Sequence, residues 1–182
     1  LNHVIVGFDE AAMAGVGICK KVEGIPAYTL MGTAQGVVPL LAYNHGAKNS
    51  ERLEKSVRCT AAAMIGVSVS FLLAFQLAAR PMASLFIKDA ETVAYAAAFI
   101  RIHCVSMPFA AVGFLLTGYF QAVKKTRQAT ALSVIRKGIF DIPLMFALNV
   151  LIPLYGPLMC QAIMDGVAAL CALVMYPRTR RS

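Results

Sequence analysis

The stretch CTAAAMIGVSVSFLLAFQLAA, residues 59–79, contains 21 residues and no charged side chain. About 20 apolar residues in a helix cross the ~30 Å hydrocarbon core of a bilayer. The stretch is too long for a strand and lacks the alternation of a membrane barrel. It therefore predicts a transmembrane helix.

Apolar stretches of similar length recur on both sides of this one, and residues 1–6 are interpreted as the tail of a truncated sixth helix. Of the 182 residues, 59% are hydrophobic and 14% are charged, whereas soluble domains carry roughly 25% charged residues. This composition excludes a cytosolic enzyme domain and a disordered chain. We predict an all-α, polytopic membrane helical bundle that forms a single domain over residues 1–182. Its five transmembrane helices are expected near residues 18–46, 58–87, 90–123, 128–152 and 156–177.

The formal net charge of +8 arises mainly from one side of the predicted bundle. The opposite side holds Lys88, with Arg80 at the edge of its span. Basic residues concentrate in cytoplasmic loops, so the C-terminus is expected in the cytoplasm. Nucleic-acid binding is not expected, because no basic stripe with interleaved aromatic residues is present. The basic residues predicted to share the cytoplasmic side are Lys48, Arg52, Lys55, Arg58, Lys124, Lys125, Arg127, Arg178, Arg180 and Arg181.

The span over residues 24–47 has a polar and small-residue face that the other spans lack. Steps of four, three, one, three and four residues place its members on one side of a helix. Such a face suits the wall of a watery cavity, or close helix packing through small residues, and both interpretations stay open. The face, called the stripe below, consists of Tyr28, Gly32, Gln35, Gly36, Pro39 and Tyr43.

Several motifs in this order resemble the MATE multidrug efflux transporters. Gln35-Gly36-Val37-Val38-Pro39 and the segment Tyr43-Asn44-His45-Gly46-Ala47-Lys48-Asn49 are similar to the family's eighth helix and following loop. Pro108-Phe109, Gly118-Tyr119-Phe120-Gln121-Ala122 and Lys124-Lys125-Thr126 are similar to its tenth helix and next loop. Arg136, Pro143 and Gly156 fit the eleventh helix, and Gln161 and Asp165 fit the twelfth.

This resemblance implies half of a twelve-helix fold, namely a C-terminal lobe whose N-terminal lobe is missing. It implies antiport of drugs or toxic organic cations out of the cell by alternating access, coupled to Na⁺ or H⁺, in the inner membrane of a bacterium. The family's acidic ion ligands lie on helices that this chain lacks or carries without Asp or Glu, so the resemblance does not identify the coupling ion. The expected cavity-lining residues are Tyr28, Gln35, Pro39, Tyr43, Asn44 and Gln121.

Two other functions remain as alternatives. A flippase for lipid-linked oligosaccharides should line its cavity with several arginines that hold pyrophosphate, and only Arg101 and Arg136 are candidates here. A non-transporting membrane assembly subunit would lack a polar cavity face, so the stripe argues against it. An enzyme is not expected, because the sequence contains no nucleophile elbow, HExxH motif or P-loop. The five cysteines have no CxxC spacing, and neither a metal site nor a cofactor is expected.

Charged residues within spans are the remaining candidates for ion coupling or charge pairing, since they are costly in a bilayer. Lys137 and Asp141 are four residues apart and can pair on one helix. Arg101 and Asp165 have no opposite charge at three or four positions on their own helices. Because both lie about 12 Å below the outer boundary at ~1.5 Å per residue, we predict that they contact each other directly or through one bridging water.

The remaining titratable residues of the outer half receive simpler interpretations. Lys20 and Glu23 are three residues apart and are interpreted as a solvated outer edge. His103 is either a proton carrier or a hydrogen-bonded packing residue, with the second preferred.

Overall fold

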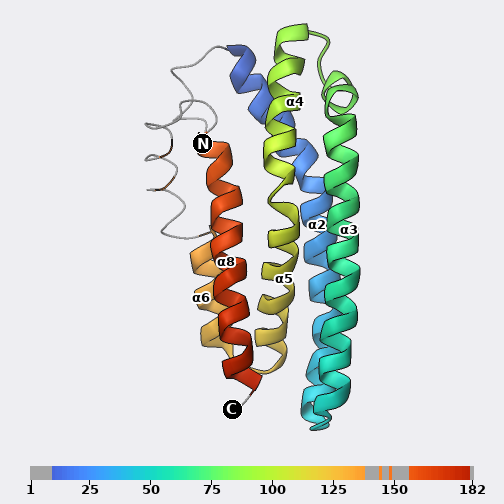
Figure 1. Ribbon diagram of the computed structural model, residues 1–182, viewed down its shortest axis with the longest axis vertical. Helices are drawn as coiled ribbons and strands as arrows, with labels where there is room; N and C mark the ends of the chain where they lie inside the picture. The colour runs from blue at the N-terminus through green and yellow to red at the C-terminus, as the bar shows by residue number, and fades with distance from the viewer. Residues whose placement is uncertain (1–9, 138–143, 145–147, 149–155, 181–182) are drawn as a thin grey trace.

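The computed structural model describes residues 10–137, 144, 148 and 156–180, and it is a bundle of helices that run side by side (Figure 1). Within these residues no strand is present, as the sequence predicts. The helices are α2 (Glu10–Gly46), α3 (Ser50–Ser84), α4 (Ala90–Cys104), α5 (Met107–Ala122), α6 (Thr126–Lys137) and α8 (Gly156–Arg180).

Helix α2 organises the bundle, because it packs against α3, α4 and α5. Helix α5 in turn packs against α6 and α8. Short turns join α2 to α3, α3 to α4 and α5 to α6, and the chain reverses its direction along the long axis at each of these turns (Figure 1). The turn between α2 and α3, the turn between α5 and α6, and the C-terminus all lie at one end of the molecule (Figure 1).

Two described helices are long and apolar enough to cross a membrane: α3, and Met159–Pro177 of α8. Helices α4 and α5 would make a third span if the bent pair is counted as one. Helix α2 has the length, at 37 residues, but Lys20, Lys21, Glu23 and the polar members of the stripe lower its hydropathy. The predicted tail at residues 1–6 and most of the predicted span at 128–152 lie outside the described residues.

The helix predicted over residues 90–123 is wrong in one respect, because it is broken. Helices α4 and α5 meet at an angle of 46°, with Val105 and Ser106 between them. Pro108 lies in the first turn of α5, where a missing N–H costs nothing and the fixed φ favours the start of a helix. The junction therefore starts a new helix in the middle of the predicted span.

Two helices begin earlier than the sequence predicts. Helix α3 begins at Ser50 rather than near 58, because the Asn49 side chain caps it by accepting a hydrogen bond from the Arg52 backbone N–H at 3.0 Å. Helix α2 begins at Glu10 rather than near 18. Charged residues are excluded from hydrocarbon but not from helices, so these helices extend beyond their apolar parts.

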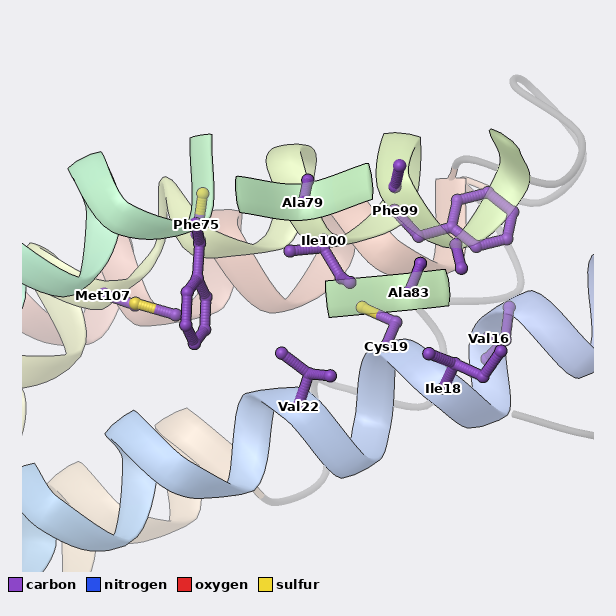
Figure 2. Packing of buried hydrophobic residues seen from close by; sticks show 13 residues of the cluster. Val16, Ile18, Cys19, Val22, Phe75, Ala79, Ala83, Phe99, Ile100 and Met107 are labelled. Carbon is purple, nitrogen blue, oxygen red and sulfur yellow. The ribbon is translucent and has the colours of Figure 1, made fainter. Parts of the chain in front are cut away.

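Among the described residues, three apolar clusters hold the helices together. The largest joins α2, α3 and α4, and its side chains converge between the helices in Figure 2. Phe99 and Ile100 of α4 are buried against Val22 and Cys19 of α2 and Phe75 of α3. Alanines at other positions of the cluster let the helix backbones approach closely.

Candidate transport cavity

A cavity of about 380 Å³ is lined by α2, the end of α4, the α4–α5 junction, α5 and α8, and it contains the buried acid Asp165 and the buried histidine His103. One wall is apolar and includes Leu30, Met31 and Phe114. The other carries polar and charged groups, and this mixture of apolar wall and few polar groups is typical of small-molecule sites. The polar lining residues are Lys20, Glu23, Tyr28, His103, Ser106, Gln161 and Asp165.

Glu23 is the centre of the charged wall. One carboxylate oxygen, Oε1, lies 3.1 Å from His103 Nε2, and the other, Oε2, lies 3.9 Å from Lys20 Nζ. The His103 side chain is 7% exposed and that of Glu23 is 19% exposed, whereas Lys20 is half exposed at the rim. The carboxylate is therefore held between a buried imidazole and a solvated ammonium group.

Asp165 of α8 lines the same cavity and is 2% exposed. Gln161, one turn earlier on α8, donates a hydrogen bond from its Nε2 to Asp165 Oδ2 at 3.4 Å. A buried carboxylate in a transmembrane helix is costly and marks a functional position. The local sequence explains the placement, because Ala168, Ala169 and Ala172 bury the same side of α8 against the bundle.

The stripe on α2 is exposed along its length, as expected for a face that does not pack within this bundle. Tyr28 is 72% exposed and Tyr43 is 73% exposed. Gln35 and Pro39 are also exposed. Tyr28 belongs both to the stripe and to the cavity lining, so the stripe continues directly into the cavity.

Of the six expected cavity-lining residues only Tyr28 lines this cavity, since Gln35, Pro39 and Tyr43 lie further along the exposed stripe and Asn44 and Gln121 lie off the stripe. Asn44 is 6% exposed and donates a hydrogen bond from Nδ2 to Ser56 Oγ of α3 at 3.3 Å. It lines a second cavity of about 350 Å³, at the end of the bundle that carries the basic turns. Gln121 is exposed near the end of α5 and lines neither cavity.

Arg101 and Asp165, which the sequence predicts to contact each other, form no direct ion pair among the described residues. Arg101 is exposed and donates a hydrogen bond from Nε to the Gln76 backbone oxygen of α3 at 3.3 Å. The direction around the helix explains this difference, because α4 buries Ile100 and Cys104 and turns Arg101 toward α3. The predicted Lys137–Asp141 pair lies outside the described side chains.

The contact that sequence reasoning missed is His103 with Glu23. Glu23 does lie near Lys20, but it is mostly buried rather than part of a solvated edge. His103 has no acid at three or four positions on its own helix, the same signal that drew attention to Arg101. Among the described residues no group of three or more His, Cys, Asp or Glu side chains is arranged to hold a metal ion.

Comparison with known proteins agrees with this architecture. The profile of the MatE family matches residues 1–147. The multidrug export protein MepA of Staphylococcus aureus (strain MSSA476) is 29% identical over 175 residues, which covers 96% of this chain and 38% of that protein. MepA of Staphylococcus saprophyticus is 27% identical over the same shares. The chain thus spans about two fifths of the length of the curated relatives that it matches.

Solved structures show the same fold. The MATE transporter ClbM in complex with Rb⁺ matches with a TM-score of 0.85 at 24% identity, over 99% of this chain and 43% of that one. The bent form of the Vibrio cholerae MATE transporter VcmN matches with a TM-score of 0.87 at 18% identity, over 98% of this chain and 41% of that one. The described helices are therefore those of a membrane helical bundle of the transporter type.

Proposed function

Because the chain belongs to the MatE family, we propose that it forms one lobe of an exporter that moves drugs or other toxic organic compounds out of the cell. The proposed transport is antiport, driven by Na⁺ or H⁺, and uses alternating access between this lobe and a second lobe. Organic cations are the proposed substrates. No enzymatic step is proposed, since the cavity contains no nucleophile held by a base.

The observation that carries this proposal is the exposed stripe and its continuity with the charged cavity. A polar helix face at membrane depth is stable where it lines water or packs against protein, and not where it faces lipid. Tyr28 joins that face to a cavity that contains Glu23 and Asp165. Two lobes that meet across the stripe would enclose a binding site at their interface, as repeat-built transporters do.

The proposed orientation places the basic end of the bundle in the cytoplasm of a bacterial cell, within the inner membrane. Lys48, Lys124 and the C-terminal arginines lie in segments that share this end (Figure 1), and the charge rule assigns such an end to the inside. The cavity at Glu23 then lies in the outer half. Glu23 precedes the end of α2 at Gly46 by about 35 Å, at ~1.5 Å per residue.

The flippase alternative is weakened by the structure. Arg101, one of its two candidate arginines, turns toward α3 and is not among the residues that line either cavity described above. An assembly subunit would need the stripe only as a packing surface. It would therefore tolerate changes that preserve packing but alter polarity.

The test is export of ethidium, an organic cation, by cells that carry the complete transporter. Gln35→Leu and Tyr28→Leu remove polar groups from the stripe, and each should lower export at least tenfold while the protein remains in the membrane. Leu77→Ala on the exposed apolar side of α3 is the control and should export normally. Normal export by both stripe variants would contradict a transport role for this face.

A further inference from the structure

Two turns at the basic end of the bundle have the same backbone geometry. One joins α2 to α3 and the other joins α5 to α6 (Figure 1). Each contains a lysine with a positive φ, namely Lys48 at 54° and Lys124 at 58°, and no other non-glycine residue of the described chain has one. In each turn the residue before this lysine donates its N–H to a tyrosine carbonyl four residues earlier, that of Tyr43 at 2.9 Å and that of Tyr119 at 3.0 Å. The turns are therefore two copies of one motif.

The left-handed lysines set the direction of the residues that follow them. In each turn the next residue donates its N–H to a carbonyl five residues earlier, at 3.1 Å for Asn49 and at 2.9 Å for Lys125. This bond belongs to the Schellman motif, which satisfies the last carbonyls where the chain leaves a helix. Asn49 and Lys125 are equivalent positions, and both line the second cavity, of about 350 Å³. This cavity thus lies between two hydrogen-bonded copies of the same turn.

The second cavity brings basic side chains from both turns together. Lys48 comes from the first turn and Lys125 from the second, and His45 lines the cavity from the last turn of α2. The one acid in the described lining is Glu54 of α3, and this carboxylate accepts a hydrogen bond from Arg58, one turn later on the same helix. The acid therefore has an adjacent cation of its own, and the lining is suited to an anion.

We propose that this second cavity binds the phosphate group of an anionic phospholipid. Lysine ammonium groups bind phosphate as point charges, and the side chains of Asn49 and Ser50 add hydrogen-bond donors to the same lining. Basic pockets between helices on the cytoplasmic side of membrane proteins bind acidic head groups. The inference concerns a different cavity from the proposed transport site and does not depend on export. Only its assignment to the cytoplasmic leaflet rests on the proposed orientation.

The aromatic and apolar parts of the lining favour a lipid over a phosphate ester from solution. The rings of Tyr119 and Tyr176 pack edge to face with their centroids 5.0 Å apart, and tyrosine is enriched at the head-group level of membranes. Leu53 and Val123 add an apolar wall for the glycerol carbons. Leu173, one turn before Tyr176 on α8, is exposed. Apolar surface therefore continues from the cavity along α8, where acyl chains can lie.

The size of the cavity agrees with a head group as its occupant. Its volume of about 350 Å³ lies near the lower end of the ~300–1,000 Å³ that small-molecule sites span. A phosphate with its glycerol fits such a volume, whereas the acyl chains would have to remain outside, in the bilayer.

The test uses the complete transporter, purified in detergent and freed of lipid, with phosphatidylglycerol as the probe and native mass spectrometry as the readout. Wild-type protein should bind phosphatidylglycerol about tenfold more tightly than zwitterionic phosphatidylcholine. The double variant Lys48→Gln with Lys125→Gln removes one cation from each turn and should weaken phosphatidylglycerol binding about tenfold. Equal binding of the two lipids by the wild type would overturn the inference.

A matched double variant separates the site from the general charge of this end of the bundle. Lys55→Gln with Lys124→Gln removes two lysines from the same end, neither of which lines the cavity, and should bind phosphatidylglycerol as the wild type does. Lys48→Arg with Lys125→Arg keeps both charges and should also retain binding. Equal weakening by the two glutamine pairs would overturn the inference, because binding would then follow net charge and not the cavity.

A measurement on the unaltered protein tests the site without relying on variants that must fold. Phosphatidylglycerol with a photoreactive acyl chain should crosslink mainly to the segment of α8 around Leu173. Crosslinks spread evenly over all lipid-facing helices would overturn the inference.

Glycerol 3-phosphate distinguishes the membrane from solution as the source of the ligand. It carries the phosphate and the glycerol but no acyl chain, so it should compete with phosphatidylglycerol only weakly. Binding as tight as that of phosphatidylglycerol, and lost in the Lys48→Gln and Lys125→Gln double variant, would overturn a lipid as the occupant.

Discussion

Helices α2 and α3 both expose large side chains, but the chemistry of the two exposed faces differs. Helix α2 presents Tyr28 and Tyr43, which are 72% and 73% exposed, together with a glutamine and glycines. Helix α3 presents Leu73 and Leu77, which are 57% and 84% exposed, among other aliphatic residues. Only α3 of the two is apolar enough to count as a membrane span on its own.

The difference shows that an exposed face of a single lobe can be suited either to lipid or to water and another protein surface. An aliphatic face such as that of α3 is stable in contact with lipid tails, which are as apolar as leucine. A face with tyrosine hydroxyls and a glutamine amide needs water or another protein surface. Burial alone therefore cannot distinguish the lipid-facing side of this bundle from the side that faces a partner lobe, whereas side-chain chemistry can.

The largest expected difference between the two faces is in access to water. Gln35→Cys should react with a membrane-impermeant maleimide, and Leu77→Cys should not, because maleimides react with thiolate in water. The difference in labelling rate in native membranes should exceed tenfold. The background needs Cys59→Ala and Cys171→Ala, since the other three cysteines are buried.

Detergent provides the control for this labelling experiment. Solubilisation removes the bilayer, so Leu77→Cys should then react at a rate similar to that of Gln35→Cys. Equal labelling of both positions in intact membranes would contradict the assignment of one face to water and the other to lipid.

The next largest effect is on membrane insertion. Leu77→Lys places a charge on a lipid-facing position two residues from the end of the uncharged stretch 59–79, and should cost part of the about 2.5–3.5 kcal/mol that a charge costs at a helix centre. Gln35→Lys on the stripe should change stability by no more than about 0.5 kcal/mol, as is usual for solvated positions. The amount of inserted full-length protein and its thermal midpoint measure both effects. A greater loss for Gln35→Lys than for Leu77→Lys would reverse the assignment of the faces.

A smaller effect separates the buried and exposed sides of α2 itself. A Cβ added at Gly118 of α5 would lie 3.2 Å from Val38 Cγ2 and 3.3 Å from the Ala34 backbone oxygen. Gly118→Ala should therefore destabilise the protein by about 1 kcal/mol, the low end of overpacking. A Cβ added at Gly36 meets no atom within 4 Å, so Gly36→Ala should stabilise it by about 0.5–1 kcal/mol through helix propensity.

Thermal unfolding of the purified transporter checks this pair of glycine variants. The two midpoints should move in opposite directions from that of the wild type. A rise in the midpoint of Gly118→Ala would show that α2 and α5 are not in close contact at this position.

The smallest effect concerns the caps at the N-termini of α3 and α4, which are independent of either face. Asp89 accepts hydrogen bonds from the side chain and backbone N–H of Thr92, and these bonds lower its pKa. Because the folded pKa lies below the unfolded value of about 3.9, the cap contributes stability above that value and loses it as the pH falls through the folded pKa.

Asp89→Asn should remove this acid dependence and keep most of the cap, since asparagine caps equally well. The helix α3 cap at Asn49 has no titratable group and serves as the internal comparison. Thermal midpoints of wild type and Asp89→Asn should be similar at neutral pH, and that of the wild type should fall below that of Asp89→Asn as the pH drops through the acidic range. Parallel curves would contradict the capping role of the ionised carboxylate.

Much of the fold could be predicted from the sequence because hydrocarbon thickness fixes the length of apolar stretches. The helix at residues 59–79 and the stripe at Tyr28–Tyr43 were visible in the sequence as one uncharged window and one residue spacing. The helix starts at Glu10 and Ser50 were missed because charge was taken as a sign of a loop. The Asn49 cap followed by an acidic first turn was the available signal.

The candidate site was less predictable, because sequence gives depth along a helix but not direction around it. Arg101 and Asp165 were placed at equal depth, yet α4 turns Arg101 toward Gln76. His103, only two residues further, faces Glu23 instead. The break after Cys104 could have been anticipated from Pro108, whose position in the first turn of a helix is common.

The break between α4 and α5 also allows α4 to rotate as a rigid unit about the junction. Its 15 residues span about 22 Å, so a change of about 10° at the junction would carry the Ala90 end through about 4 Å. His103 lies within one helix turn of this junction. Ser106, the N-cap residue of α5 at the junction, makes no side-chain capping hydrogen bond. A small rotation near His103 is thereby converted into a displacement of about 4 Å at the Ala90 end of α4, which is most of the ~5.4 Å rise of one helix turn.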